Sequence, residues 1–90
     1  MGGMPWNPMM AVQRVSDDEG HLYDGNVRVA ILRQVRIGRP SALLWRSVTG
    51  DQAPDDRHLV GYFPSIQMAA AVTWRSWNQR HKPVEQHALA

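Results

Sequence analysis

The sequence contains no cysteine, and its ten basic residues include a single lysine. The missing thiols exclude disulfides, cysteine metal sites and thiol catalysis. Because small secreted domains usually depend on such cross-links, we expect a cytoplasmic protein. No run of about 18 apolar residues occurs, so no membrane span is predicted. The first ten residues also lack the basic start and apolar core of a signal peptide.

Signatures of catalysis and cofactor binding are missing as well. The chain has neither a phosphate-binding loop nor a dinucleotide-binding glycine motif. Its four histidines are not at metal-ligand spacing. Asp55 and Asp56 beside His58 offer a cation site or a base, but such a run is typical of a solvated loop. We therefore expect no enzyme, no metal and no cofactor in a chain of 90 residues, which is one domain at most.

Positive charge is concentrated in one window. The formal net charge is only +2, yet the segment from Asn26 to Gly50 holds no acidic residue and five arginines: Arg28, Arg33, Arg36, Arg39 and Arg46. Arginine in place of lysine favours planar, bidentate contacts to phosphate or carboxylate. A GC-rich coding genome also raises arginine over lysine, and this alternative stays open.

Three stretches have the alternation of a strand: residues 27–37, 41–48 and 58–63. We predict that their inward side chains are Val27, Val29, Ile31, Leu43, Trp45, Leu59 and Phe63. Arg33 falls at an inward position, which a bulge near residues 32–34 would explain. Residues 1–25 carry little periodicity and are predicted to be a flexible arm with one possible short strand at residues 10–15.

A helix follows the third strand. Ser65 is a good N-cap, and the apolar spacing then becomes helical at Ile66, Ala69, Ala70, Thr73, Trp74 and Trp77. Pro83 ends the helix, and residues 83–90 are predicted to be a frayed tail. The predicted fold is therefore α+β: a three-stranded antiparallel sheet packed on one C-terminal amphipathic helix, in a single domain over residues 26–82.

The exposed sheet face is the first candidate site. Arg28, Gln34, Arg36 and Arg46 are predicted to share that face, with Arg39 at the first turn. The predicted nucleic-acid-binding residues are Arg28, Arg33, Arg36, Arg39 and Arg46, which would hold phosphates and read one or two bases at most. The plain alternative is a solvated face on which arginine stems cover apolar surface.

The stretch from Leu59 to Ala71, LVGYFPSIQMAAA, resembles the last strand and helix start of AP2-type and phage-integrase arm-type DNA-binding domains. The resemblance covers about 15 residues and common residue types. It implies three strands backed by an alanine-rich helix, with the sheet face in a DNA groove, and it extends to Arg28, Arg36 and Arg46 only. The loop at residues 49–57 is longer and more acidic than in those families.

A protein-interaction module is the second hypothesis. Four tryptophans are many for this length. Trp45, Trp74 and Trp77 are predicted core residues, whereas Trp6 either tucks back onto the domain or anchors a partner. Trp6 and Tyr62 are the predicted partner-binding residues, and a sheet edge could pair with a protein partner or with a second copy. A phage- or plasmid-type accessory protein fits either hypothesis.

Overall fold

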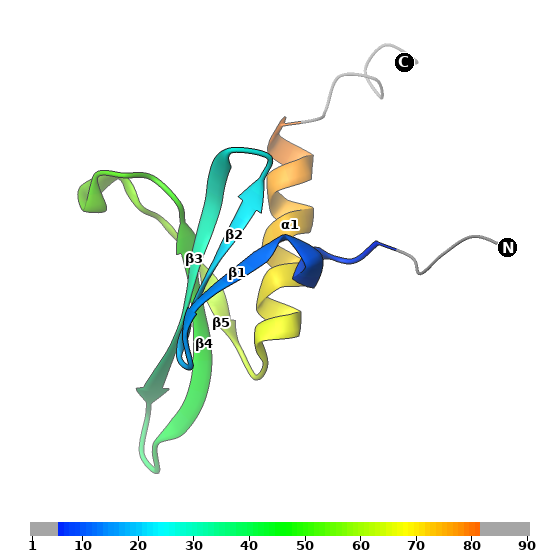
Figure 1. The fold of residues 1–90 in the computed structure, drawn as a ribbon. Helices are drawn as coiled ribbons and strands as arrows, with labels where there is room; N and C mark the ends of the chain where they lie inside the picture. Colours follow the sequence, from blue (N-terminus) through cyan, green and yellow to red (C-terminus); the bar gives the residue numbers. More distant parts are fainter. Residues whose placement is uncertain (1–5, 82–90) are drawn as a thin grey trace, which may run out of the picture.

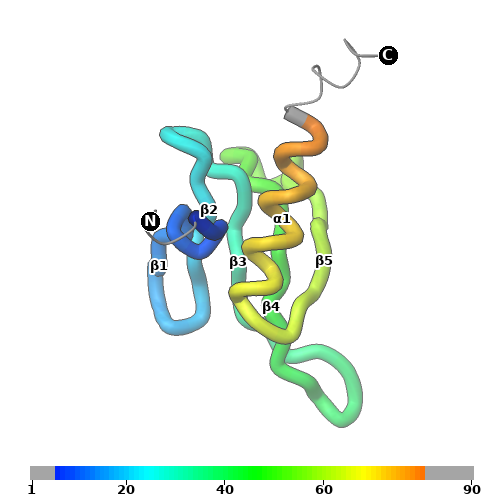
Figure 2. The backbone as a smooth tube through the Cα atoms, turned by 90° about the vertical axis from the view of Figure 1, so that its right-hand side faces the viewer, coloured from blue at the N-terminus to red at the C-terminus, as the bar shows by residue number. Residues whose placement is uncertain are grey.

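The computed structural model describes residues 6–81. They form a five-stranded antiparallel sheet whose strands lie side by side in chain order, with one helix across a single face (Figures 1 and 2). The strands are β1 (Val12–Ser16), β2 (Glu19–Asp24), β3 (Val27–Ile37), β4 (Ala42–Thr49) and β5 (Leu59–Phe63). Helix α1 runs over Ile66–His81, and the short 3-10 turns are η1 (Pro8–Ala11) and η2 (Pro54–Asp56).

The prediction of an α+β fold with a C-terminal helix agrees with this architecture, but the prediction of three strands is wrong. Strands β1 and β2 lie in the segment that was predicted to be a flexible arm. They are ordered because β2 pairs with β3 along its length and places Leu22, which is fully buried, in the core. The predicted tail at residues 83–90 lies outside the described residues, as do residues 1–5 of the arm.

Helix α1 follows its predicted pattern. The Ser65 hydroxyl accepts a hydrogen bond from the Met68 amide at 3.1 Å, which caps the first turn. Ile66, Ala69, Ala70 and Thr73 are buried against the sheet, while Trp74 and Trp77 are half-buried at the edge of the contact. The alanines let the helix backbone approach the sheet closely.

Two side-chain contacts hold α1 against the rest of the domain. The Trp77 indole donates to a carboxylate oxygen of Asp24 at 2.8 Å, at the end of β2. Trp6 packs against Trp74 with ring centroids 4.9 Å apart, so of its two predicted alternatives the ring tucks back onto the domain. It keeps 52 % of its surface exposed.

A bulge in β3 decides which side chains face the helix. Tyr23 pairs with Arg28 and Leu22 pairs with Ala30, so Val29 is the extra residue. Side chains alternate between the two faces along a strand, and one extra residue reverses the alternation beyond it. Ala30 and Leu32 are therefore fully buried under the helix. The bulge predicted near residues 32–34 lies at Val29 instead.

The predicted inward set is accordingly only partly right. Val29, Trp45 and Phe63 contribute to the core. Ile31 lies on the face away from α1, and three other predicted core residues are more than a third exposed: Val27, Leu43 and Leu59. Val27 and Leu43 belong to the ends of their strands, outside the area that α1 covers.

The β3–β4 hairpin extends past the start of α1, as Figures 1 and 2 show. It closes through the turn at residues 38–41, where Gly38 has a positive φ of 88°. Within residues 6–81, no helix combines the length and the apolar character that crossing a membrane requires.

Candidate nucleic-acid interface

One buried hydrogen bond identifies the two faces of the sheet. The hydroxyl groups of Ser47 and Thr73 lie 2.6 Å apart, and both residues are almost fully buried, so the Ser47 side chain points at α1. Its neighbours Arg46 and Val48 must then point the other way. We call the face of the sheet away from α1 the open face.

A row of four side chains crosses the open face from β2 to β5. The cross-strand partners are Glu19 with Arg33, Arg33 with Arg46, and Arg46 with Tyr62. We call these four residues the arginine row. Adjacent strands are about 4.8 Å apart, so the side chains of Arg33 and Arg46 leave the backbone at directly opposite positions. Like charges directly opposite each other destabilise a sheet unless something neutralises them.

Neither Arg33 nor Arg46 forms an ion pair with a neighbouring carboxylate among residues 6–81. The Glu19 carboxylate instead lies 2.8 Å from the Nε2 atom of the His21 ring. The Ser16 hydroxyl donates to Asp18 at 2.7 Å and is the main reason why the pKa of Asp18 lies below its usual value, with a smaller contribution from the positive charge of Arg33.

Apolar side chains surround the arginine row. His21, Ile31, Val48 and Leu59 pair in a second row on one side of it, and Val35 pairs with Leu44 on the other. We call the five aliphatic residues the apolar floor: Ile31, Val35, Leu44, Val48 and Leu59. Leu59 is 55 % exposed, and the other four are half-buried although no element within residues 6–81 covers them.

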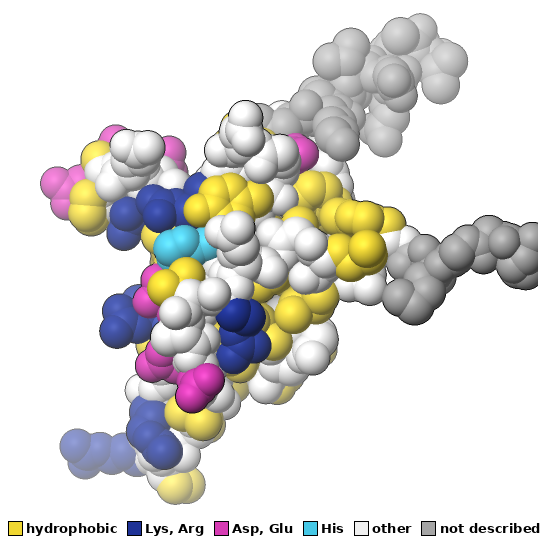
Figure 3. Space-filling view, viewed as in Figure 1, with side chains coloured by type: hydrophobic (Ala, Val, Ile, Leu, Met, Phe, Trp, Pro, Cys, Tyr) yellow, Lys and Arg dark blue, Asp and Glu magenta, His cyan; other side chains and the backbone are white. Residues whose placement is uncertain are grey.

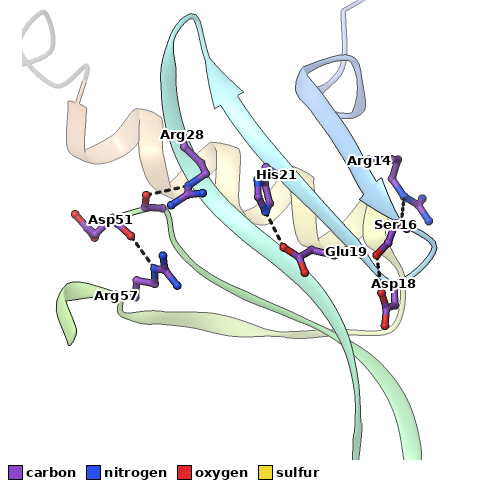
Figure 4. A network of polar contacts seen from close by, with 9 residues as sticks. Arg14, Ser16, Asp18, Glu19, His21, Arg28, Asp51 and Arg57 are labelled. Atoms are coloured by element: carbon purple, nitrogen blue, oxygen red, sulfur yellow. Dashed lines mark hydrogen bonds and ion pairs between the residues drawn. The ribbon is translucent and has the colours of Figure 1, made fainter. Parts of the chain in front are cut away.

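Arg28 joins the open face at its far end. As the partner of Tyr23 before the bulge, it points away from α1, and its Nε donates to the Gly50 carbonyl at 3.2 Å. Figure 4 shows Arg28 beside Asp51 and Arg57, two residues of the loop that follows β4. Arg57 donates to the backbone carbonyl of Asp51 at 2.7 Å, so this arginine is used to shape the loop.

The five predicted arginines therefore separate into groups. Arg28, Arg33 and Arg46 share the open face. Arg36 pairs with Leu43 on the opposite face, beyond the start of α1, and Arg39 lies in the turn at residues 38–41. The prediction that Gln34 and Arg36 share a face with Arg28 is wrong, because the bulge at Val29 lies between them. Figure 3 shows basic side chains along the side of the molecule away from α1 and at its lower end.

Sequence reasoning missed the apolar floor, because Ile31 and Leu59 were expected in the core. Gly50 was a sequence signal for the bulge in β3, because this glycine packs directly against it. A Cβ at this position would lie 2.1 Å from the Arg28 carbonyl oxygen, so only glycine lets the loop approach β3 there. Such close approach is what an interior glycine next to a long strand indicates.

The described residues hold no group of three histidine, aspartate or glutamate side chains placed to bind a metal ion. Comparisons with protein-family models, with curated proteins and with solved structures give no match for the chain. The resemblance to AP2-type and integrase arm-type domains therefore stays a prediction.

Proposed function

We propose that this protein binds nucleic acid through the β3–β4 hairpin and the open face. The observation that supports the proposal is the set of five arginines on the β3–β4 hairpin, four in its strands and Arg39 in its turn, with no acidic residue between Asn26 and Gly50. Among the described residues none of the five forms an ion pair. Arginines that lack a carboxylate partner are free to take phosphate oxygens, singly or in bidentate pairs.

The mechanism is phosphate neutralisation. Arg33 and Arg46 contact phosphates on the open face, while Arg36 and Arg39 extend the contact along the hairpin. Each neutralised phosphate releases condensed counterions, and this release makes the affinity fall as salt rises. Phosphate contacts carry no sequence information, so the proposal is for binding with weak sequence preference.

Fluorescence anisotropy of labelled oligonucleotides, titrated at about 50 and 200 mM salt, tests the proposal. We expect the affinity to fall about tenfold or more between the two. Arg46→Gln should weaken binding and lower the salt slope by about one. Arg75→Gln is the matched control, because Arg75 is an exposed arginine on α1, away from the open face. No binding at the lower salt, or equal losses in both variants, would refute the proposal.

A further inference from the structure

We infer that the nucleic acid taken by the open face is single-stranded, with an unpaired base stacked on Tyr62. This inference rests on the proposed function and concerns the form of the ligand. It starts from the composition of the open face, where the two central arginines, Arg33 and Arg46, stand in the middle of the apolar floor.

The apolar floor distinguishes between the two forms of nucleic acid. A duplex turns its sugar-phosphate backbones outwards, so a flat sheet face meets charge and finds little apolar surface to cover. A single strand can turn its bases towards the protein while its phosphates reach nearby arginines. Only the second arrangement covers Leu59 and the half-buried aliphatic residues beside it.

Tyr62 supplies the stacking surface. It is 44 % exposed and lies on the open face, directly beside Arg46 on the next strand. The backbone of Arg46 is therefore one strand spacing, about 4.8 Å, from that of Tyr62, and the backbone of Arg33 is two spacings away, so both arginines can reach the phosphates beside a base on the ring. An aromatic ring next to positively charged side chains is the combination that binds single strands with little sequence preference.

The loop after β4 sets the position of the strand. It carries Asp51, Asp55 and Asp56, all exposed, and in Figure 1 it projects from the open side of the sheet. Phosphates are repelled from this end. The single strand therefore lies over the arginine row and continues towards the turn at residues 38–41, where Arg39 is exposed.

The test compares a fluorescein-labelled oligothymidine of about 20 nucleotides with the same strand annealed to oligoadenosine, at about 100 mM salt. We expect the single strand to bind at least about tenfold more tightly than the duplex. Tyr62→Leu keeps an apolar side chain but removes the ring, and should weaken single-strand binding roughly 5- to 150-fold with little effect on the duplex. Tyr62→Phe keeps the ring and should bind as the unchanged protein does.

The outcomes separate the two proposals. If the duplex binds as tightly as the single strand, or if Tyr62→Leu leaves single-strand binding unchanged, the inference is wrong while arginine-dependent binding stands. If neither oligonucleotide binds even at about 50 mM salt, both proposals fall. Circular dichroism confirms that each variant is folded, and should Tyr62→Leu fail to fold, the comparison of the two oligonucleotides on the unchanged protein still decides.

Discussion

The Ser47–Thr73 hydrogen bond can be tested by removing either hydroxyl group. Thr73→Val keeps the shape of the side chain but leaves the Ser47 hydroxyl buried without its partner. An unsatisfied buried hydroxyl costs about 1–3 kcal/mol, and we expect a loss of this size because both residues are almost fully buried. Ser47→Ala should cost less, about 1 kcal/mol, because a helical threonine can turn its hydroxyl to the carbonyl one turn earlier.

The double variant makes the test sharp. With both hydroxyl groups gone, no polar group is left unsatisfied, so the summed losses of the single variants should exceed the loss of the double variant by about 1–2 kcal/mol. Urea denaturation followed by tryptophan fluorescence measures these differences as shifts in the midpoint at constant slope. Ser41→Ala, in the exposed turn, serves as the control.

Additive effects, or an unchanged midpoint for Thr73→Val, would show that Ser47 does not face α1. The assignment of Arg46 to the open face would then fall as well, since the two residues are neighbours on β4. The stability experiment is therefore also an independent check on the geometry of the candidate site.

Two further predictions concern the sheet and its first turn. Gly50→Ala should destabilise the fold by about 1–3 kcal/mol or more, because the added Cβ would meet the β3 backbone. Gly61→Ala should cost less, because its Cβ would meet the Phe63 ring, which can move. Thermal unfolding of the two variants measures the difference. Ser16→Ala should raise the pKa of Asp18 towards its usual value, which an NMR pH titration measures. The Asp18 pKa is lower in the folded state than in the unfolded state, so ionised Asp18 makes a small contribution to stability above the unfolded pKa. This contribution is lost as the pH falls through the folded pKa. Ser16→Ala should make this pH-dependent loss of stability smaller.

The helix was predictable from sequence because it has a cap, an unbroken stripe and a length of several turns. Strand β3 was recognised as a strand, but its faces were assigned the wrong way round beyond Val29. The alternation of side chains along a strand does not reveal where an extra residue is inserted. A single undetected bulge therefore exchanges the side chains expected to be buried with those expected to be exposed. The position of the bulge depends on β2 and Gly50, which contact β3 only after folding.

The possible short strand predicted at residues 10–15 overlaps β1, whereas β2 was not predicted. In β2 the sequence Glu19-Gly20-His21 is polar, and Leu22 is the one large apolar side chain that is fully buried. Pairing with β3 stabilises this strand more than its own propensity does. The sequence shows that the arginines form a basic window. Which face of the sheet each arginine occupies depends on the strand register, which only the structure gives.

The order of the strands also bears on how the chain folds. Each strand pairs with the one just made, so most contacts join residues that are close in the sequence, which is typical of proteins that fold quickly. The helix that covers Leu32 and Trp45, however, follows all five strands in the sequence. During synthesis, the apolar face of the sheet is therefore exposed to solvent until α1 has left the ribosome and packed against it. Because exposed apolar surface promotes aggregation, premature termination before residue 66 should leave a fragment that aggregates.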